Sequence, residues 1–456
     1  MQTINKKVII TVLVAMVILP TFYIGYITAD SNGGLISSRR SAECIPLTAG
    51  SAQPYKLPLG WKIETIIEED IAQAYIEDLP DMNQQNMIAI DMPQALKDHG
   101  VNDDSAERGR LLYQTHERWE GGASVSVVDL ETRIAAKMLE ADHLEALDGL
   151  LWTPWNTLIF AEEMDEQKIR DPNVPDAIGG LAYEMDPVSG EYWPLPQLGA
   201  MAHEGIMIDE NMNIYVVDED KRGSIYKFIP NENPMINGRI GDGDLYVLRI
   251  IDDTAAPGER TGTAEWILLN QTLVRIDAEK AAEVVNATLY NRPEDLELIG
   301  NKLYVALTGA SSPGPVDNRI ISIDISNPTQ PFVTEFVVPG INVPIEIDND
   351  DDKSDEQTGF SNPDNLAKRG NELWIAEDNS PSDIWVAKPD RDGDGYSDKI
   401  TLFTSMEDCA AESTGLLWGI GKYHNKLFIT QQHAGPIYED VEIGADKIFV
   451  ISRGQN

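Results

Sequence analysis

The sequence is poor in basic residues, and this shortage narrows the range of partners. Lysine and arginine number 35 against 76 aspartate and glutamate residues, which gives a formal net charge of -41 over 456 residues. A surface this acidic repels nucleic acid and anionic lipid, so we expect neither as a partner. Solubility, a solvated surface and the binding of cations remain as explanations of the acid excess.

Cysteine is also scarce. The chain has two, Cys44 and Cys409, and therefore no Cys-x-x-Cys motif. In an oxidising compartment we expect these two residues to form a disulfide. Closing so long a loop would stabilise the fold by up to about 5 kcal/mol in the chain-entropy model. Two unrelated thiols are the alternative.

The motifs of several hydrolase and nucleotide-binding classes are missing. The sequence has no Gly-x-Ser-x-Gly elbow, no HExxH pair and no P-loop lysine motif. These motifs supply a serine nucleophile, a zinc site and a phosphate-binding loop, respectively. The sequence therefore gives no support to those three chemistries.

The N-terminus has the pattern of an export segment. Lys6 and Lys7 precede an apolar run from Val8 to about Ala29, and no twin arginine comes before it, which favours general secretion. A run of about 20 apolar residues serves either as a cleaved signal peptide or as a membrane anchor, and both remain open. We predict a signal peptide or signal anchor over 1–29, a linker over 30–59 and the folded domain over 60–456. The domain would be extracellular or periplasmic, or anchored to the outer face of the cytoplasmic membrane through an uncleaved segment.

Short β-rich runs bounded by turn residues recur along the chain, whereas helical patterns are scarce, the best being 132–147. Six runs share a turn, an apolar strand and a polar end: "GRLLYQTHE", "WNTLIFAEE", "NMNIYVVDED", "GNKLYVALTG", "GNELWIAED" and "HNKLFITQQH". Their equivalent residues are Leu112, Leu158, Ile214, Leu303, Leu373 and Leu427. Spacings of 46 to 89 residues are close to or above the length of a four-stranded propeller blade.

These units predict an all-β fold, a single β-propeller with six blades. The longer intervals would hold insertions, such as 231–242 and the acidic tract 346–357, and we expect one short helical segment. A seventh blade remains possible, and we expect a monomer.

The polar strand ends, together with a second signature one hairpin earlier ("AHEGIMID", "RPEDLELI", "NPDNLAKR", "STGLLWGI"), predict a ring of side chains around the propeller channel. Carboxylates that face one channel cannot all stay ionised without a counter-charge, so we predict bound cations. Oxygen ligands suit Ca²⁺ or Mg²⁺, and the histidines with carboxylates would also accept Fe or Mn. Turn capping and ion pairs with residues such as Arg292 are the alternative. The ring comprises His116, Glu117, Glu162, Glu163, His203, Glu204, Asp218, Glu219, Glu294, Asp364, Asn365, Glu377, Asp378, Gln432 and His433.

A second cation site is predicted in the segment "DRDGDGYSD". Its spacing matches the first nine positions of a calcium loop, with Asp390, Asp392, Asp394, the Tyr396 carbonyl and Asp398 as ligands. The twelfth position is Thr401 instead of a bidentate Glu, so we expect a structural Ca²⁺ in a β-hairpin without flanking helices. A solvated acidic turn is the alternative.

Several segments, in the same order along the chain, resemble the PhoX-type alkaline phosphatases, a family of exported propeller enzymes. They are "TPWNTLIFAEE", "AHEG", "IYVVDED" to "YKFIP", "RPED", "NPDNL" with "AED", and "QQH". The resemblance implies phosphate-ester hydrolysis at a mixed iron and calcium cluster. It implies the metal ligands Glu162, Glu204, Glu294, Asp364 and Glu377, together with the ring members Glu163, Asp218, Glu219 and Asp378, and a contact of Arg292 or Asn156 with phosphate.

The chain departs from the family pattern at two sites. Ala161 stands where the family has a metal-binding cysteine, and oxygen ligands alone favour harder ions than iron, so Ca²⁺ is the first expectation and Fe³⁺ or another transition metal the second. The usual Glu-Asp strand end is inverted as Asp218-Glu219.

The predicted function is an exported metal-dependent phosphoesterase that acts on a small-molecule phosphate ester. A non-catalytic, calcium-stabilised propeller that serves as a binding or structural module is the first alternative. A calcium-dependent lactonase-type hydrolase, with Glu162, Asn365 and Asp378 around the ion, is the second.

Overall fold

The computed structural model describes residues 54–68, 81–88, 91–101, 107–252, 260–309, 317–344, 359–379, 382–408, 411–432, 437–438, 441–442 and 446–454. The chain divides into two compact units, Met1–Arg39 and Arg40–Asn456, and all of the described residues belong to the second. The export segment, both cysteines, the acidic tract 346–357 and His433 lie outside the described residues. Within the described part, no helix combines the length and apolar content needed to cross a bilayer.

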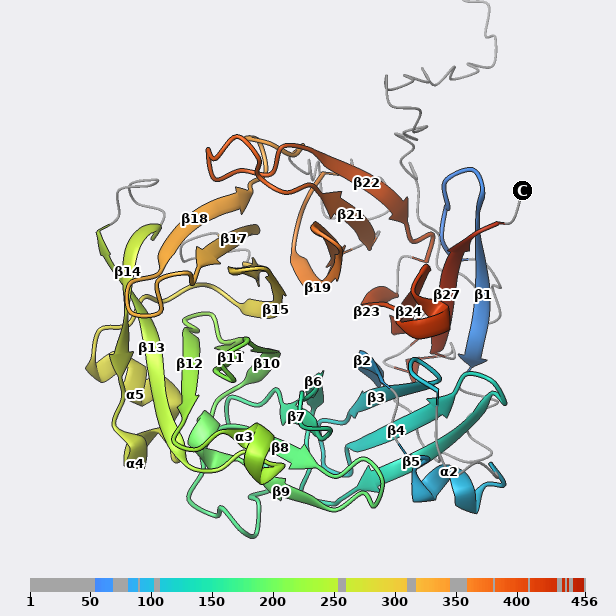
Figure 1. The fold of residues 1–456 in the computed structure, drawn as a ribbon, viewed down its shortest axis with the longest axis horizontal. Coiled ribbons are helices and arrows are strands. Elements are labelled where there is room, and N and C mark those ends of the chain that lie inside the picture. Colours follow the sequence, from blue (N-terminus) through green and yellow to red (C-terminus); the bar gives the residue numbers. More distant parts are fainter. Residues whose placement is uncertain are drawn as a thin grey trace, which may run out of the picture. The chain divides into compact units, whose positions relative to one another are not determined.

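Antiparallel four-stranded units make up most of the described chain (Figure 1). The first unit contains β2 (Asp81–Ile88), β3 (Leu111–Glu117), β4 (Ser124–Asp129) and β5 (Ile134–Glu140). The second contains β6 (Leu147–Trp152), β7 (Leu158–Glu162), β8 (Ala182–Met185) and β9 (Tyr192–Pro194). The third contains β10 (His203–Ile208), β11 (Ile214–Asp218), β12 (Ile225–Pro230) and β13 (Gly243–Asp252).

The remaining units follow the same plan. The fourth contains β15 (Pro293–Ile299), β16 (Lys302–Leu307), β17 (Arg319–Asp324) and β18 (Phe332–Val337). The fifth contains β19 (Pro363–Arg369), β20 (Glu372–Glu377), β21 (Asp383–Ala387) and β22 (Ile400–Ser405). The sixth contains β23 (Glu412–Trp418), β24 (Lys426–Gln432), β27 (Lys447–Arg453) and the N-terminal strand β1 (Trp61–Glu68). A separate hairpin pairs β25 (Ile437–Tyr438) with β26 (Val441–Glu442).

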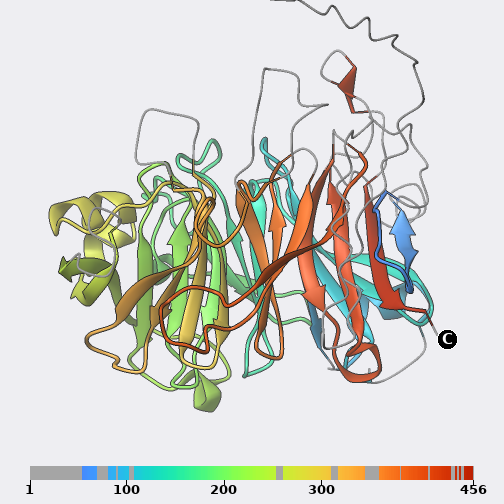
Figure 2. The same cartoon turned by 90° about the horizontal axis from the view of Figure 1, so that it is seen from above.

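The first strands of these units form a closed ring. β2 packs beside β6, β6 beside β10, β10 beside β15, β15 beside β19, β19 beside β23, and β23 again beside β2. These six strands lie innermost in Figure 1, and Figure 2 shows the strands running along the axis viewed in Figure 1. The arrangement is a β-propeller, which confirms the predicted fold class.

The number of blades is a separate matter. β14 (Gly262–Leu268) pairs with both β13 and β18 and thereby joins the third and fourth units into one nine-stranded sheet. The predicted count of six blades therefore stays a prediction.

Apolar side chains from both faces of each unit form the core. In β7, Leu158 and Phe160 join the cluster shared with the first unit, whereas Ile159 and Ala161 join the cluster shared with the third. Such alternation follows from the two-residue period of a strand. Because both faces are covered, the strands are apolar at successive positions, which produces the short apolar runs of the sequence repeat. The six equivalent repeat residues all lie in the second strand of a unit, β3, β7, β11, β16, β20 and β24.

The last unit joins the two ends of the described chain. β1 pairs antiparallel with β27, from Trp61 opposite Arg453 to Glu68 opposite Lys447. The N-terminal strand thereby completes the last unit and ties the two ends of the described chain together.

The helical expectation over 132–147 is wrong, because half of this segment forms β5 and the first residue of β6, and the rest forms turns and loops. β5 pairs with β4 along its length, and these ladder bonds outweigh helix preferences of a few tenths of a kcal/mol per residue. The described helices are instead short: α2 (Gln94–Asp98), α3 (Pro234–Asn237), α4 (Gln271–Val274) and α5 (Ala278–Val284). α3 lies in the predicted insertion 231–242.

Candidate metal centre

The same irregularity occurs in each of the six inner strands. Near its start, three residues of the inner strand lie opposite two residues of the neighbouring strand, so that each inner strand carries one extra residue, a β-bulge. The shifts fall between Met82 and Gln85, Leu147 and Leu150, His203 and Ile206, Pro293 and Leu296, Pro363 and Leu366, and Thr414 and Leu417.

Four of these bulges carry a carboxylate at the same position. A bulge turns a side chain away from the direction that a regular strand would give it. The four bulge carboxylates, which come from four different units, line a single cavity. They are Asp148, Glu204, Glu294 and Asp364.

The second strands deliver a further set of acids at their ends. The backbone N–H groups of Glu163, Glu219 and Asp378 each donate a 2.9 Å hydrogen bond to the carbonyl of the residue that precedes the adjacent inner strand, Ala146, Ala202 and Asn362 respectively. These repeated bonds hold the strand end beside the bulge. Glu163 and Asp378 line the cavity, and so does Glu117 at the end of β3.

The preceding acid of each pair points elsewhere, because successive strand side chains face opposite sides. Glu162 accepts hydrogen bonds from the backbone N–H of Glu145 at 3.1 Å, from Gln167 Nε2 at 2.9 Å and from the Leu181 N–H at 2.9 Å. Glu377 accepts bonds from the Ser361 N–H and Trp385 Nε1, both at 2.8 Å. Neither Glu162, Glu377 nor the buried Asp218 belongs to the cavity lining. The structure thus brings the second member of two predicted pairs, Glu163 and Asp378, to the cavity lining. Glu219, the second member of the third pair, is not part of the lining and instead forms an ion pair with Arg292.

The cavity has a volume of about 210 Å³. Eight carboxylates line it, and among its described lining residues Arg292 is the one cation. Carboxylate oxygens of Asp148, Glu163 and Glu204 lie within 4.8 Å of one another, which is the spacing of ligands around one ion. The complete lining is Glu117, Trp119, Asp148, Glu163, Glu204, Arg292, Glu294, Asp364, Asp378, Glu412 and Gln432.

Burial and mutual repulsion oppose the ionisation of five of these acids in the absence of a cation. Burial raises the pKa of Asp148 to about 7, and repulsion from Glu219 adds to the effect. Burial, followed by the charges of neighbouring acids, raises the pKa values of Glu163, Glu204, Glu294 and Asp364 well above their usual range. A cation would reverse this shift by stabilising the ionised forms.

Arg292 provides part of the compensation. It forms ion pairs with Glu219, with Glu294 at 2.9 Å and with Asp378 at 3.8 Å. Burial opposes its charge, but Glu294, Glu219 and Asp378 together raise the pKa of Arg292 above its ordinary value. One arginine cannot balance eight carboxylates, so a charge deficit remains.

The cavity residues fit a hard cation. Glu204 is buried, and its Oε2 atom has no hydrogen-bond partner among the described residues. The described lining offers carboxylate and amide oxygens but no histidine or cysteine. His116 and His203 instead bond to Ser126 Oγ at 2.6 Å and the Gly199 carbonyl at 2.9 Å, and burial lowers their pKa values to about 3 and about 4. These two predicted ring members act as neutral core residues.

The predicted calcium loop connects β21 and β22. Carboxylate oxygens of Asp390, Asp392 and Asp398 lie within 4.8 Å of one another. Asp390 accepts bonds from the Gly393 N–H at 2.7 Å and the Gly395 N–H at 3.1 Å, and the Asp394 carboxylate accepts one from the Tyr396 N–H at 2.8 Å. Lys302 lies 3.7 Å from Asp390 and partly offsets its charge.

Comparison with known proteins now adds a second line of support. The model of the family described as alkaline phosphatase PhoX matches residues 149–435, more than half of the chain. The chain belongs to the PhoX alkaline phosphatase family. This membership supports an alkaline phosphatase-like phosphoesterase and confirms the resemblance seen in the sequence motifs.

One solved structure supports the fold. The chain resembles Pseudomonas fluorescens PhoX in complex with vanadate, with a TM-score of 0.62 and 16% identity over 91% of this chain and 98% of that one. A catalytically inactive virginiamycin B lyase from Staphylococcus aureus has a TM-score of 0.41 and 12% identity over 86% of this chain and 99% of that one. No curated protein sequence matches the chain.

The structure shows which residues of the PhoX-like motifs line the cavity and which do not. Asn156 is exposed in the β6–β7 turn, at the opposite end of these strands from Asp148 and Glu163, so its placement does not favour the predicted phosphate contact. Ala161, at the family cysteine position, is fully buried in an apolar cluster. The lactonase-type set is not brought together, because Asn365 lines a different cavity from Asp378, and Glu162 lines neither.

Asp148 was missed by sequence reasoning. It lies in "LDGLLW", which has the same order of acid, small or polar residue and apolar residue as "HEGIM", "PEDLEL" and "PDNLAK". Aligning this segment with those three signatures would have placed Asp148 at the bulge position.

Single glutamine substitutions at Glu162 and Glu163 test whether Glu163 binds metal while Glu162 stabilises the fold. We expect Glu163→Gln to weaken metal binding at least about tenfold, because it removes one carboxylate from the closest group. Glu162→Gln should leave metal content at the wild-type level and lower the free energy of unfolding by about 1–3 kcal/mol, because it disturbs buried hydrogen bonds. Elemental analysis and thermal unfolding of both variants check this; equal metal loss in the two would contradict the placement.

The raised pKa values predict how stability depends on pH. From pH 6.5 upward the unfolded carboxyls are ionised, whereas cavity acids such as Asp148, with a pKa of about 7, still hold protons in the metal-free fold. The two buried histidines are neutral in the fold and lose the rest of their charge in the unfolded chain just above their ordinary pKa of 6.5, so they oppose this trend less than the five cavity acids drive it. The folded state then binds more protons, so the stability of chelator-treated protein should fall from pH 6.5 to 8. Added Ca²⁺ should restore it more at pH 8 than at pH 6.5. A chelator-treated melting temperature that rises over this range would contradict the assignment.

Proposed function

We propose that the protein is an exported, metal-dependent phosphomonoesterase whose reaction takes place in the carboxylate-lined cavity. The observation that carries the proposal is the convergence of eight carboxylates and Arg292 on one cavity in a chain of the PhoX family. Such a concentration of acids is costly unless a cation compensates it. A site that combines cations with an arginine suits a phosphate ester, which is an anion.

Asp148, Glu163 and Glu204 would hold the first ion, and Glu294, Asp364 and Asp378 lie on the remaining wall to hold others. A bound cation would polarise phosphoryl oxygens and offset the charge that develops in the transition state. The oxygen-only donor set favours Ca²⁺ over softer ions, with Fe³⁺ or another transition metal as the family-based alternative. The substrate would be a small molecule, since the cavity of about 210 Å³ admits little more than a phosphate group and its nearest atoms.

Arg292 would bind the phosphate group. Its closest contacts with acids are made by the Nε and Nη2 atoms, and in this proposal Nη1 is the donor to a phosphate oxygen. The planar guanidinium suits phosphate oxygens. Its acidic partners would hold it at the cavity wall while this donor faces the substrate.

Export would bring the enzyme to ester substrates outside the cytoplasm. PhoX family members are exported phosphatases, and the apolar run 8–29 has the composition of an export segment. Calcium is plentiful outside cells, which agrees with the preference of the donor set. We propose a monomer.

A specific observation favours a second candidate, a non-catalytic calcium-stabilised binding module. Ala161 offers no metal ligand at the position of the family cysteine. If that ligand is indispensable for turnover, the cavity would retain ions without hydrolysing esters.

Hydrolysis of a generic phosphomonoester separates these candidates. We expect turnover with a metal ion and none after chelation, and we expect Arg292→Lys to lower kcat/KM about a hundredfold, because a lysine cannot reproduce the guanidinium geometry. Arg249→Lys is the control, since Arg249 pairs with Glu265 at 2.6 Å in a part of the sheet that does not line the cavity. No turnover with any metal would favour the binding module, and full activity of Arg292→Lys would exclude its role at phosphate.

The loop 390–398 would hold a structural Ca²⁺ through Asp390, Asp392, Asp394, the Tyr396 carbonyl and Asp398. Three of its carboxylates already face one point, and repulsion among them would be relieved by an ion. The loop connects β21 and β22 and none of its residues lines the cavity, so it has no part in hydrolysis in this proposal.

Substitution of Asp392 tests the loop. We expect Asp392→Ala to lower the melting temperature in Ca²⁺ and to leave it unchanged in chelator, because the side chain contributes through the ion. Asp324→Ala is the control, since Asp324 caps an ordinary turn by accepting a 2.9 Å bond from the Ser326 N–H. Equal destabilisation by Asp392→Ala in Ca²⁺ and in chelator would show that the loop is an acidic turn that does not hold an ion.

A further inference from the structure

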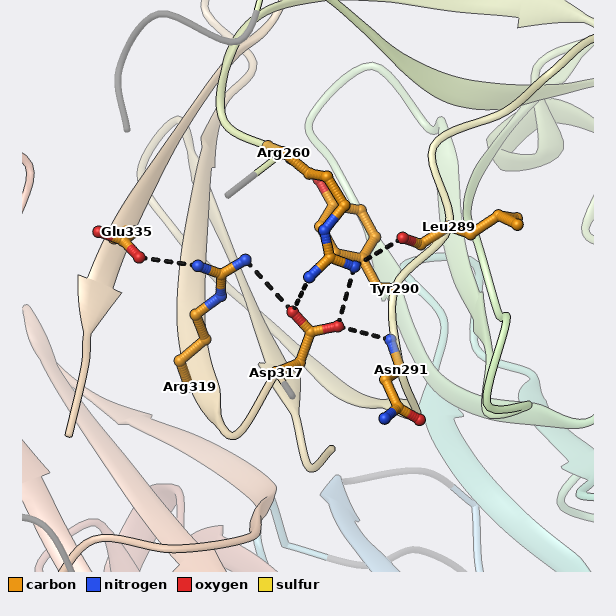
Figure 3. Close-up of polar contacts among 7 residues, drawn as sticks. All are labelled: Arg260, Leu289, Tyr290, Asn291, Asp317, Arg319 and Glu335. Atoms are coloured by element: carbon orange, nitrogen blue, oxygen red, sulfur yellow. Dashed lines mark hydrogen bonds and ion pairs between the residues drawn. The ribbon is translucent and has the colours of Figure 1, made fainter. Parts of the chain in front are cut away.

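A buried network of charged residues lies beside the cavity arginine. Its centre is Asp317, whose side chain is fully buried. Figure 3 shows two arginines and a backbone N–H converging on this carboxylate. Arg260 contacts both of its oxygens, at 2.5 and 3.1 Å, and Arg319 contacts one, at 3.2 Å.

The outer members of the network are also satisfied. Arg319 bonds to Glu335 on β18 at 2.7 Å, and Arg260 bonds to the Leu289 carbonyl at 2.7 Å and stacks over the Tyr290 ring at 5.1 Å (Figure 3). Two cations and two carboxylates thus balance one another in a mostly buried site. Charge-assisted bonds of this kind form a rigid anchor.

The anchor reaches the cavity through the backbone. Asp317 Oδ2 accepts a 2.6 Å hydrogen bond from the N–H of Asn291, the residue that precedes Arg292. Further backbone bonds hold the same segment, from the Gly309 N–H to the Asn291 carbonyl at 3.1 Å and from the Thr308 N–H to the Arg292 carbonyl at 3.0 Å. Asp317 is the charged group among these contacts.

Arg292 needs such an anchor because its backbone is strained. Its φ angle is +50°, in the left-handed region, which costs a residue with a side chain about 1–2 kcal/mol. The surrounding structure must impose this conformation. If the backbone relaxed to negative φ, the guanidinium would leave its three acidic partners at the cavity wall.

We propose that Asp317 is a positioning residue that acts through Asn291 to hold Arg292 in its strained, phosphate-facing conformation. The inference rests on the proposed phosphate-binding role of Arg292. Asp317 itself touches neither the cavity nor the substrate. Arg260 and Arg319 hold its carboxylate in place.

The test compares two buried Asp-to-Asn substitutions in the full-length protein. Asp317→Asn should lower kcat/KM for a generic phosphomonoester about tenfold, because the arginine is misplaced, and should weaken inhibition by inorganic phosphate. Asp129→Asn is the matched control. Asp129 is buried and is held by Arg110 at 2.7 and 2.8 Å in the first unit, so the substitution should cost stability with less than about a twofold change in kcat/KM.

A double-mutant cycle separates positioning from general destabilisation. If Asp317 acts through Arg292, adding Asp317→Asn to Arg292→Lys should lower kcat/KM little further, whereas Asp129→Asn should combine additively with it. Additive effects of Asp317→Asn, or activity equal to that of Asp129→Asn, would overturn the inference. If Asp317→Asn does not fold, Arg260→Lys, which loses the two-oxygen contact, should give a smaller effect in the same direction, and wild-type kinetics there would overturn it.

A measurement that does not depend on turnover tests this inference separately from the proposed function. Phenylglyoxal modification of Arg292, followed by peptide mass spectrometry, should be faster in Asp317→Asn than in wild type and unchanged in Asp129→Asn. If wild-type protein neither hydrolyses the ester nor binds phosphate, the proposed function fails, while the modification rates still decide whether Asp317 holds Arg292. If wild type is active and the rates do not differ, only the positioning role fails.

Discussion

Repulsion among converging carboxylates is the constraint on which this structure depends. Eight acids from different strands share a cavity of about 210 Å³ with one arginine. Their ionisation in a buried site is unfavourable without opposite charge, and the available positive charge is too small. The protein must therefore keep the acids protonated or bind cations. The acids lie on strand ends and strand bulges, and the Oε2 atom of Glu204 has no hydrogen-bond partner in the part of the chain that the structure describes. Both observations favour cations.

The propeller builds this centre by repeating one local device. Every inner strand has a bulge near its start, and in four units the residue after the second strand donates a backbone hydrogen bond to the residue before the inner strand. In the second and fifth units the bulge directs one acid into the cavity and the strand end directs a second. The same geometry also holds non-acidic residues, because Arg292 occupies the position that Ala146 and Asn362 occupy in other units, all with positive φ. Function thus depends on which side chain each unit places in a shared backbone frame.

Much of this could be predicted from the sequence, because strand ends and turn residues leave a periodic signal. The sequence repeat, through residues such as Leu158 and Leu373, correctly marked the second strands of the units. Two acids that it placed at strand ends, Glu163 and Asp378, line the cavity. The sequence alone could not show which of Glu162 and Glu163 faces the channel. Successive side chains of a strand point to opposite faces, and the channel face is fixed only by the register with the inner strand. The helical pattern over 132–147 failed because strand pairing with β4 overrides local preference. The link from Asp317 to Arg292 joins two segments that carry no recognisable sequence motif, so it can be seen only in the folded structure.

The central claim is that the carboxylate cavity holds metal ions between Asp148, Glu163 and Glu204. The most direct test is a crystal structure of protein purified without chelator, with anomalous diffraction measured on both sides of the iron absorption edge and at a longer wavelength sensitive to calcium. The account predicts an anomalous peak in contact with these three carboxylates, strongest at the calcium-sensitive wavelength. A cavity that contains only water, with the three acids hydrogen-bonded to one another at the pH of the crystal, would contradict it.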